Sequence, residues 1–160
     1  MIDERLFRQA MSRFASGVTV VTTAFEGQLA GLTVSAFTSL SLKPTLVLVS
    51  IGNYNESHSV IMKAGRFAVN ILRDTQVHVS QRFAARGVER FVPDTYLLSE
   101  RGLPLLHGCL VNLECEIVEQ YAGGDHTIFI GEVLEAYIHS GEPLLYYRSS
   151  YARLGDKLEP

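Results

Sequence analysis

The chain has 160 residues, of which 47% are hydrophobic and 19% are charged, and its formal net charge is −3. This length and hydrophobic content predict a single compact domain spanning residues 1–160 rather than a disordered chain. The weakly acidic balance gives no electrostatic reason to expect nucleic acid as a partner. No stretch approaches the roughly 20 apolar residues that a membrane span needs, and the charged start lacks an apolar signal segment, so the expected location is the cytoplasm.

Three segments have the apolar periodicity and the end signals of α-helices. They cover residues 4–15, 55–65 and 75–87. Asp3 provides an N-cap for the first, and Asn55 or Ser57 for the second. Gly17 and Gly65 follow the first two and favour their termination.

The rest of the chain shows the alternation or the β-branched runs that are typical of strands. The predicted strands cover residues 18–25, 29–42, 45–51, 66–72, 110–121, 126–138 and 144–148. Residues 87–104 have little periodicity and predict a long loop. Strands joined mostly by hairpins, with few peripheral helices, predict a mainly β fold, an antiparallel barrel rather than a doubly wound sheet.

Several predicted strands are apolar on both faces. Between residues 126 and 134, Ile128, Ile130 and Leu134 face one way, while Phe129 and Val133 face the other. The outer wall of a monomeric barrel should be polar, so something must cover this surface. A homodimer is the favoured interpretation, and a covering helix alone is the alternative.

The only two cysteines, Cys109 and Cys115, are placed on one predicted strand. Six strand residues span about 20 Å, whereas a disulfide requires Cα atoms within about 7 Å. We therefore expect two reduced thiols in the core. The sequence has no CxxC or HExxH motif and no cluster of metal ligands, so no metal site is predicted.

Two segments carry polar groups in patterns that favour ligand binding. On a strand, one face would hold Thr33, Ser35, Phe37 and Ser39, and the other Val34, Ala36 and Thr38. Hydroxyls beside a phenyl ring suit a flat heteroaromatic ligand, although an exposed polar strand face gives the same pattern. If the third helix continued, Arg82, Arg86 and Arg90 would form a basic stripe for phosphate or simply a solvated face.

A third segment is the turn at residues 122–126, where two glycines and Asp125 precede His126. The imidazole either contacts a ligand or is an ordinary polar residue at a loop edge. Motifs for a Rossmann site, a P-loop or a serine nucleophile are missing, and no nucleophile is paired with a base. Side chains alone offer little chemistry, as expected when a cofactor carries the reaction.

The chain resembles flavin reductase-like proteins, the small reductase components of two-component monooxygenases that hydroxylate phenol or 4-hydroxyphenylacetate. The resemblance spans about residues 4–155. It rests on RFASGVTVVTT (13–23), GLTVSAFTSLSLKPTLVLVSI (31–51), FAVNIL (67–72), FA (83–84), GLPLLHGCLVNLECEI (102–117), GDHTIFIGEV (124–133) and PLLYYRSSYARL (143–154).

The resemblance implies an FMN-binding split β-barrel homodimer that transfers hydride from NADH or NADPH to FAD or FMN and supplies reduced flavin to a partner monooxygenase. No catalytic side chain is implied, because positioning performs the hydride transfer. The implied flavin-binding residues are Thr33, Val34, Ser35, Ala36, Phe37, Ser39, Ser50, Ile51, Ser57, Phe83, Ala84 and Ala85. The implied nicotinamide-binding residues are Asp125, His126, Tyr147 and Tyr151.

The stretch GNYNESHS at residues 52–59 is atypical of this family and leaves the choice between FAD and FMN open. Because a fold does not determine a function, two alternatives remain on the same barrel. One is another flavoenzyme, and the other is a flavin-binding protein without turnover.

Overall fold

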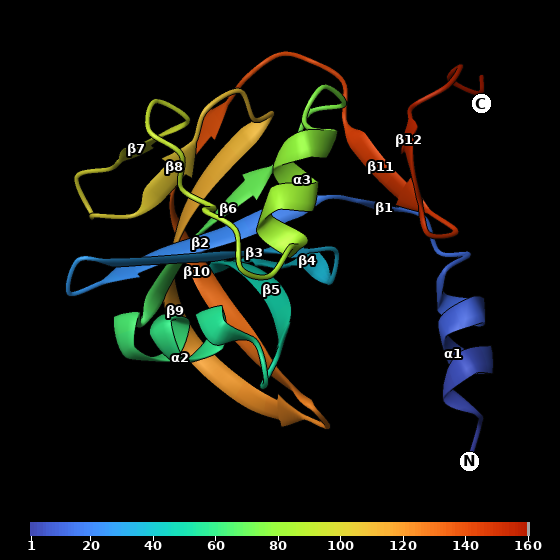
Figure 1. Cartoon of the computed structure of the whole chain (residues 1–160), viewed down its shortest axis with the longest axis horizontal. Helices are drawn as coiled ribbons and strands as arrows, with labels where there is room; N and C mark the ends of the chain where they lie inside the picture. The colour runs from blue at the N-terminus through green and yellow to red at the C-terminus, as the bar shows by residue number, and fades with distance from the viewer. Residues whose placement is uncertain (160) are drawn as a thin grey trace.

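The computed structural model describes residues 1–159, and its main element is a seven-stranded sheet in the order β3-β2-β6-β9-β10-β5-β4 (Figure 1). All neighbouring strands are antiparallel. The strands are β2 (Thr19–Phe25), β3 (Gln28–Val34), β4 (Phe37–Leu42), β5 (Thr45–Gly52), β6 (Arg66–Ile71), β9 (Val111–Gly123) and β10 (His126–Ile138). The predicted mainly β, antiparallel architecture is confirmed.

The other elements are small and lie around this sheet. A three-stranded sheet consists of β1 (Ser16–Gly17), β11 (Leu144–Tyr147) and β12 (Ser150–Arg153), and β7 (Tyr96–Leu98) pairs with β8 (Pro104–Leu106). The helices are α1 (Glu4–Met11), α2 (Glu56–Ala64) and α3 (Val77–Ala84). Figure 1 shows α2 and α3 beside the large sheet, whereas α1 stands apart on the side of β11 and β12. None of the helices in residues 1–159 has the length and apolar character to cross a membrane.

Buried aliphatic and aromatic side chains from alternate strand positions fill the barrel. Phe67 of β6 and Phe129 of β10 are among the largest, and both are fully buried. The close packing depends on Gly131, because a Cβ atom there would lie 2.6 Å from the Phe67 ring. A second cluster, which includes Phe83, fixes α3 against the barrel.

The prediction of one continuous strand over residues 29–42 is wrong. The strand ends at Val34, and β4 begins at Phe37 and pairs with β5 instead of β2 or β3. Residues 35 and 36 cross from β3 to β4, which form the two edges of the large sheet. The covalent chain, rather than a hydrogen-bonded ladder, thus joins the two edges. We call the region around residues 35 and 36 the seam.

Four other boundaries differ from the sequence-based expectation. The first and third helices end early, at residues 11 and 84, and the expected loop at 87–104 contains β7 and the start of β8. An additional strand, β12, follows a tight turn after residue 147. In the last two cases β7 pairs with β8 and β12 pairs with β11, so short local hairpins form where the sequence shows no long alternating segment.

Both cysteines are free and buried, as expected. Their placement on one strand is wrong, because Cys109 precedes the first residue of β9. Burial raises the pKa of the Cys109 thiol to about 11 and that of Cys115 to about 12. Both groups therefore remain protonated near neutral pH.

Candidate functional site

A hollow of about 230 Å³ opens at the seam. Six of the predicted flavin-binding residues line it together with His126 from the tip of the β9–β10 hairpin. These six are Thr33, Val34, Ser35, Ala36, Ser50 and Ile51. The structure therefore brings the polar stretch, the end of β5 and the histidine into one place.

The backbone at the seam presents hydrogen-bond donors that the protein does not use. The carbonyl of Ser35 accepts from the amide of Phe37 at 2.9 Å, and that of Ala36 accepts from the amide of Ser50 at 3.0 Å. No group within residues 1–159 accepts from the amides of Ser35 or Ala36. Both residues are exposed, so their amides can donate to a ligand that presents ring nitrogen or carbonyl acceptors.

Two further hollows extend the first into a groove. The second, of about 540 Å³, shares four lining residues with the first and adds Glu56, Phe83, Ala84, Arg86 and Arg90. The third, of about 300 Å³, shares Glu56 and Arg90 with the second and includes Ser57 and residues 87–91. The groove thus runs from the seam past the start of α2 and the end of α3.

The start of α2 is fixed against β3 by two hydrogen bonds. The side chain of Asn55 caps the helix by accepting from the amide of Ser57 at 2.9 Å. The Ser57 hydroxyl donates to the carbonyl of Gly31 at 3.1 Å. The positive end of the α2 dipole therefore adjoins the groove, where it favours an anionic group such as phosphate.

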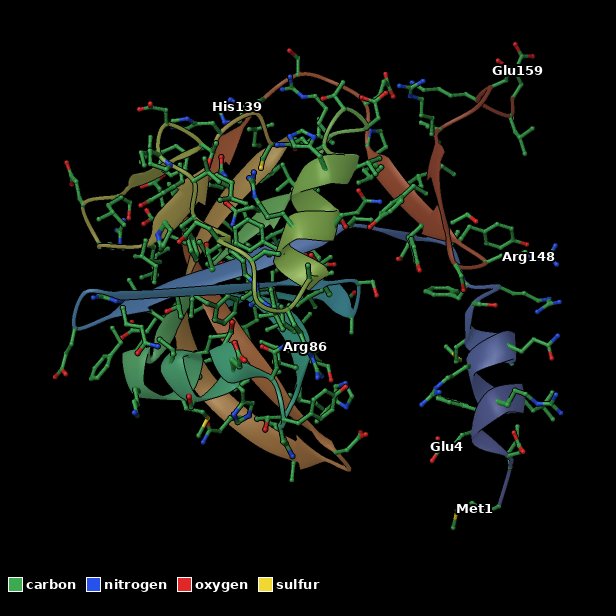
Figure 2. All side chains as sticks on the ribbon, in the orientation of Figure 1. Met1, Glu4, Arg86, His139, Arg148 and Glu159 are labelled. Carbon is green, nitrogen blue, oxygen red and sulfur yellow. The ribbon has the colours of Figure 1, made fainter. Side chains whose placement is uncertain are left out.

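The third helix does not continue far enough to form a basic stripe, because α3 ends before Arg86 and Arg90. Arg90 instead donates to the carbonyls of Gly31 at 2.8 Å and Ala85 at 2.7 Å, and so ties the loop after α3 to β3. Arg86 is exposed and lies between the end of α3 and α2 (Figure 2). The groove therefore carries two cationic side chains, one of them fixed in place, while Arg82 lines a different cavity.

The hairpin tip orients the imidazole of His126 towards the seam. Its Nδ1 lies 2.7 Å from a carboxylate oxygen of Asp125, and this hydrogen bond lowers the pKa of the Asp125 carboxyl. An ionised carboxylate only accepts hydrogen bonds, so Nδ1 carries a proton and donates. The other ring nitrogen, Nε2, is left available to a ligand in the hollow.

The largest cavity, of about 640 Å³, lies where β7 and β8 meet β9 and β10. None of the residues that the sequence predicted for flavin or nicotinamide lines it. The groove at the seam is therefore the candidate site.

Comparison with known proteins identifies the relatives of this chain. The flavin reductase like domain matches residues 11–155. An NADH-dependent flavin reductase of a Rhodococcus species is 42% identical, and the match covers 92% of this chain and 84% of that protein. The chain belongs to the flavin reductase-like family.

Solved structures agree with this assignment. Flavin reductase PheA2 superposes with a TM-score of 0.90 at 41% identity, over 97% of this chain and 100% of that one. The Streptomyces globisporus NADH:FAD oxidoreductase SgcE6, solved with NAD and FAD fragments, gives a TM-score of 0.93 at 35% identity, over 98% and 96% of the two chains. The predicted family, split-barrel fold and nicotinamide-dependent flavin reductase activity are confirmed.

In this flavin reductase, several predicted site residues lie outside the groove. The hydroxyl of Tyr151 hydrogen-bonds to Ser80 of α3 at 2.8 Å, and the carbonyl of Ser80 accepts from Thr33 at 2.6 Å. Tyr151 therefore supports the seam through α3 rather than lining it. The predicted residues that line none of the three hollows are Phe37, Ser39, Ala85, Asp125, Tyr147 and Tyr151.

The reductase also has groove residues that the sequence analysis missed. One of them is Tyr54, which is 72% exposed and lines the first two hollows. A Cβ atom at Gly52 would lie 3.0 Å from the Tyr54 ring, so the ring covers the end of β5. The available signal was an aromatic residue in a polar loop directly after a buried strand. The other missed residues of the first two hollows are Leu32, Gly52, Asn55 and Glu56.

Proposed function

We propose that this flavin reductase binds the isoalloxazine ring at the seam and NADH against the hairpin tip, and that it supplies reduced flavin to a separate oxygenase. The unused amides of Ser35 and Ala36 in the seam hollow carry the assignment of the ring. The oxygenase partner is supported by a Rhodococcus opacus relative, 39% identical, which is named as the reductase component of a 4-nitrophenol monooxygenase.

Flavin supplies the chemistry, because its ring accepts a hydride from the nicotinamide. The protein orients the two rings, and such near-attack positioning can account for up to about 7–11 kcal/mol of the barrier. The seam amides donate to the ring edge on which negative charge accumulates during reduction. The Nε2 atom of His126 contacts the nicotinamide nucleotide, and no side chain is needed as an acid or base.

The length of the groove favours FAD over FMN as the flavin. The first two hollows accommodate the ring and the ribityl phosphate, with Arg86 beside the phosphate. The third hollow, beyond Arg90, provides about 300 Å³ for the adenylate that only FAD has. We therefore expect tighter binding of FAD than of FMN.

The direct test is to follow NADH absorbance in the presence of FAD or FMN. Rapid oxidation is expected with both, and flavin binding without oxidation would support the alternative of a binding protein. The Ser35→Phe variant should lose flavin affinity through steric block, as measured by quenching of flavin fluorescence. Ser59→Phe on the exposed face of α2 is the matched control. An unchanged flavin affinity of Ser35→Phe would contradict the seam assignment.

We also propose that the reductase is a homodimer in which α1 packs against the second copy. None of the α1 residues is buried, and α1 stands apart from the barrel (Figure 1). The apolar side chains Leu6, Phe7, Met11 and Phe14 are 52–77% exposed. Because an isolated helix of eight residues is unstable in water, α1 requires a surface to cover this apolar stripe, and a second copy provides one.

Light scattering after gel filtration tests the homodimer. The wild type should show twice the chain mass of 17.7 kDa, and Phe7→Glu should shift the mass towards the monomer. Gln9→Glu adds the same charge to α1 as a control and should leave the mass unchanged. A monomer mass for the wild type at micromolar concentration would contradict the homodimer.

A further inference from the structure

The atypical stretch at residues 52–59 is linked to the hairpin tip by three hydrogen bonds. The amide of Asn53 donates to the carbonyl of Asp125 at 2.9 Å. The hydroxyl of Thr127 donates to the side-chain oxygen of Asn53 at 2.7 Å. The Nε2 atom of His58, on α2, lies 2.8 Å from the same hydroxyl. We call the side chains of Asn53, His58 and Thr127 the clamp.

The donors and acceptors of the clamp match without conflict. The hydroxyl of Thr127 has one proton, and the amide oxygen of Asn53 uses it because that oxygen can only accept. The Thr127 oxygen must therefore accept from His58, whose Nε2 carries the proton. A neutral imidazole with the proton on Nε2 provides this donor, and so does a charged imidazolium.

The clamp contacts β10 on the face opposite His126. Because successive strand side chains alternate, Thr127 and Phe129 share one face while His126 takes the other. The ring of His58 packs against Phe129, with centroids 5.6 Å apart, and Phe129 is fully buried. His58 is therefore anchored to the core and holds the strand from behind, while the imidazole of His126 lines the seam hollow.

The clamp joins the loop at residues 52–59 to the hairpin tip, and these two segments differ in their other hydrogen bonds. The loop on the flavin side is already fixed by the Asn55 cap and by the bond from Ser57 to Gly31. The hairpin tip follows an exposed turn containing Gly123 and Gly124, where Gly124 has a φ of +67°. Strand pairing also places His126 opposite Gly52 of β5, and the clamp adds side-chain hydrogen bonds that fix the tip over the loop.

We propose that Thr127 and His58 are positioning residues that hold the hairpin tip so that Nε2 of His126 meets the bound nicotinamide nucleotide. This inference rests on the role of His126 in the proposed function. It gives the atypical stretch a task that is separate from binding flavin.

The test is steady-state kinetics of the FAD-saturated reductase with varied NADH. The Thr127→Val variant removes two hydrogen bonds of the clamp and His58→Leu removes one. Each should raise the KM for NADH by about 2–10-fold. The kcat and the FAD affinity should change less than about twofold, because the loop keeps its other bonds. Thr127→Ser and His58→Gln retain an acceptor and a donor at these positions and should restore the wild-type KM.

Thr45→Val is the matched control for Thr127→Val. The hydroxyl of Thr45 donates to the carbonyl of Val133 at 3.4 Å, so it bridges the same two strands at their other end, away from the groove. This control should leave the KM for NADH unchanged. If Thr127→Val lowers FAD and NADH affinity in parallel with the melting temperature, its role is merely structural and the inference is overturned.

A double-mutant cycle separates the clamp from the role of His126. In a His126→Ala background, Thr127→Val should have almost no further effect on the KM for NADH, because the group that it positions is gone. If Thr127→Val keeps its full effect there, or has none in the wild type, the clamp inference alone is overturned. If His126→Ala leaves the KM unchanged, the proposed role of His126 fails, and the clamp inference fails with it.

Discussion

Replacement of His126 by alanine is expected to weaken NADH binding selectively. Hydrogen bonds to charged groups contribute about 1.5–3 kcal/mol, which corresponds to roughly 10–150-fold in affinity. The His126 side chain is 39% exposed, so water competes for this bond and the lower part of the range applies. We expect the KM for NADH to rise about tenfold and at most about a hundredfold.

The assay combines steady-state kinetics at saturating flavin with a thermal melt and a flavin titration. The melting temperature should barely change, because the imidazole is outside the buried core. Flavin affinity should change much less than NADH affinity, because the amides of Ser35 and Ala36 hold the flavin ring in the proposed site. An unchanged KM would show that His126 is an ordinary turn residue. A marked loss of stability would instead assign it to the core, and either result would refute the reasoning.

Removal of the neighbouring carboxylate gives a smaller effect with a defined pH dependence. Asp125→Ala frees Nδ1 of His126 and should raise the KM for NADH by about 2–10-fold. The hydrogen bond with His126 lowers the pKa of the Asp125 carboxyl below its usual 3.8. The carboxylate therefore accepts this hydrogen bond at any pH above the lowered pKa, and the bond is lost only as the pH falls through the lowered pKa. The Asp125 carboxylate is therefore ionised throughout pH 5–8, and the KM of the variant should exceed that of the wild type at every pH in this range.

Three further outcomes follow from the packing, the groove and the thiols. Gly131→Ala places a methyl group 2.6 Å from the fully buried ring of Phe67, so calorimetry should show a loss of about 1–3 kcal/mol in the free energy of unfolding. Gly17→Ala is the control, because its methyl group meets no atom within 4 Å, and it should melt like the wild type. Arg86→Gln should reduce affinity for FAD and FMN by similar factors if Arg86 contacts the phosphate that both contain, and unequal factors would argue against that contact. The two buried thiols, with pKa values of about 11 and 12, should resist iodoacetamide at pH 8 until denaturant is added, and rapid labelling of the folded reductase would contradict their burial.

The β9–β10 hairpin is the part of the fold that the sequence predicts most accurately. Alternating residues on both sides of a Gly-Gly-Asp turn define it locally, and the structure begins β10 at the expected His126. The break at residues 35 and 36 has no such local signal. The alternation continues through it without glycine or proline, and only pairing of residues 37–42 with β5 interrupts the strand.

The residues of the candidate site likewise divide into those that the sequence predicts and those that it does not. Residues of the seam belong to stretches that resemble a known family, so the sequence indicates Ser35 and Ser50 without a structure. The clamp escapes such an analysis, because Asn53 and Thr127 are distant in the sequence and meet only when β5 pairs with β10. Tyr54 was missed for the same reason, since its contact with the groove depends on where the loop folds.

The β9–β10 hairpin also has a consequence for the order in which the enzyme assembles. It pairs residues close in sequence, such as Gly123 with His126, whereas β10 meets β5 through residues as distant as Gly52 and His126. Hairpins form within about 1–10 μs, and contacts between distant segments form more slowly because longer loops must close first. The turn that carries His126 should therefore form early during refolding. The flavin pocket should form later, once β5 has paired with β10. Recovery of flavin binding should follow the slowest refolding phase, after the hairpin has regained its strand signal.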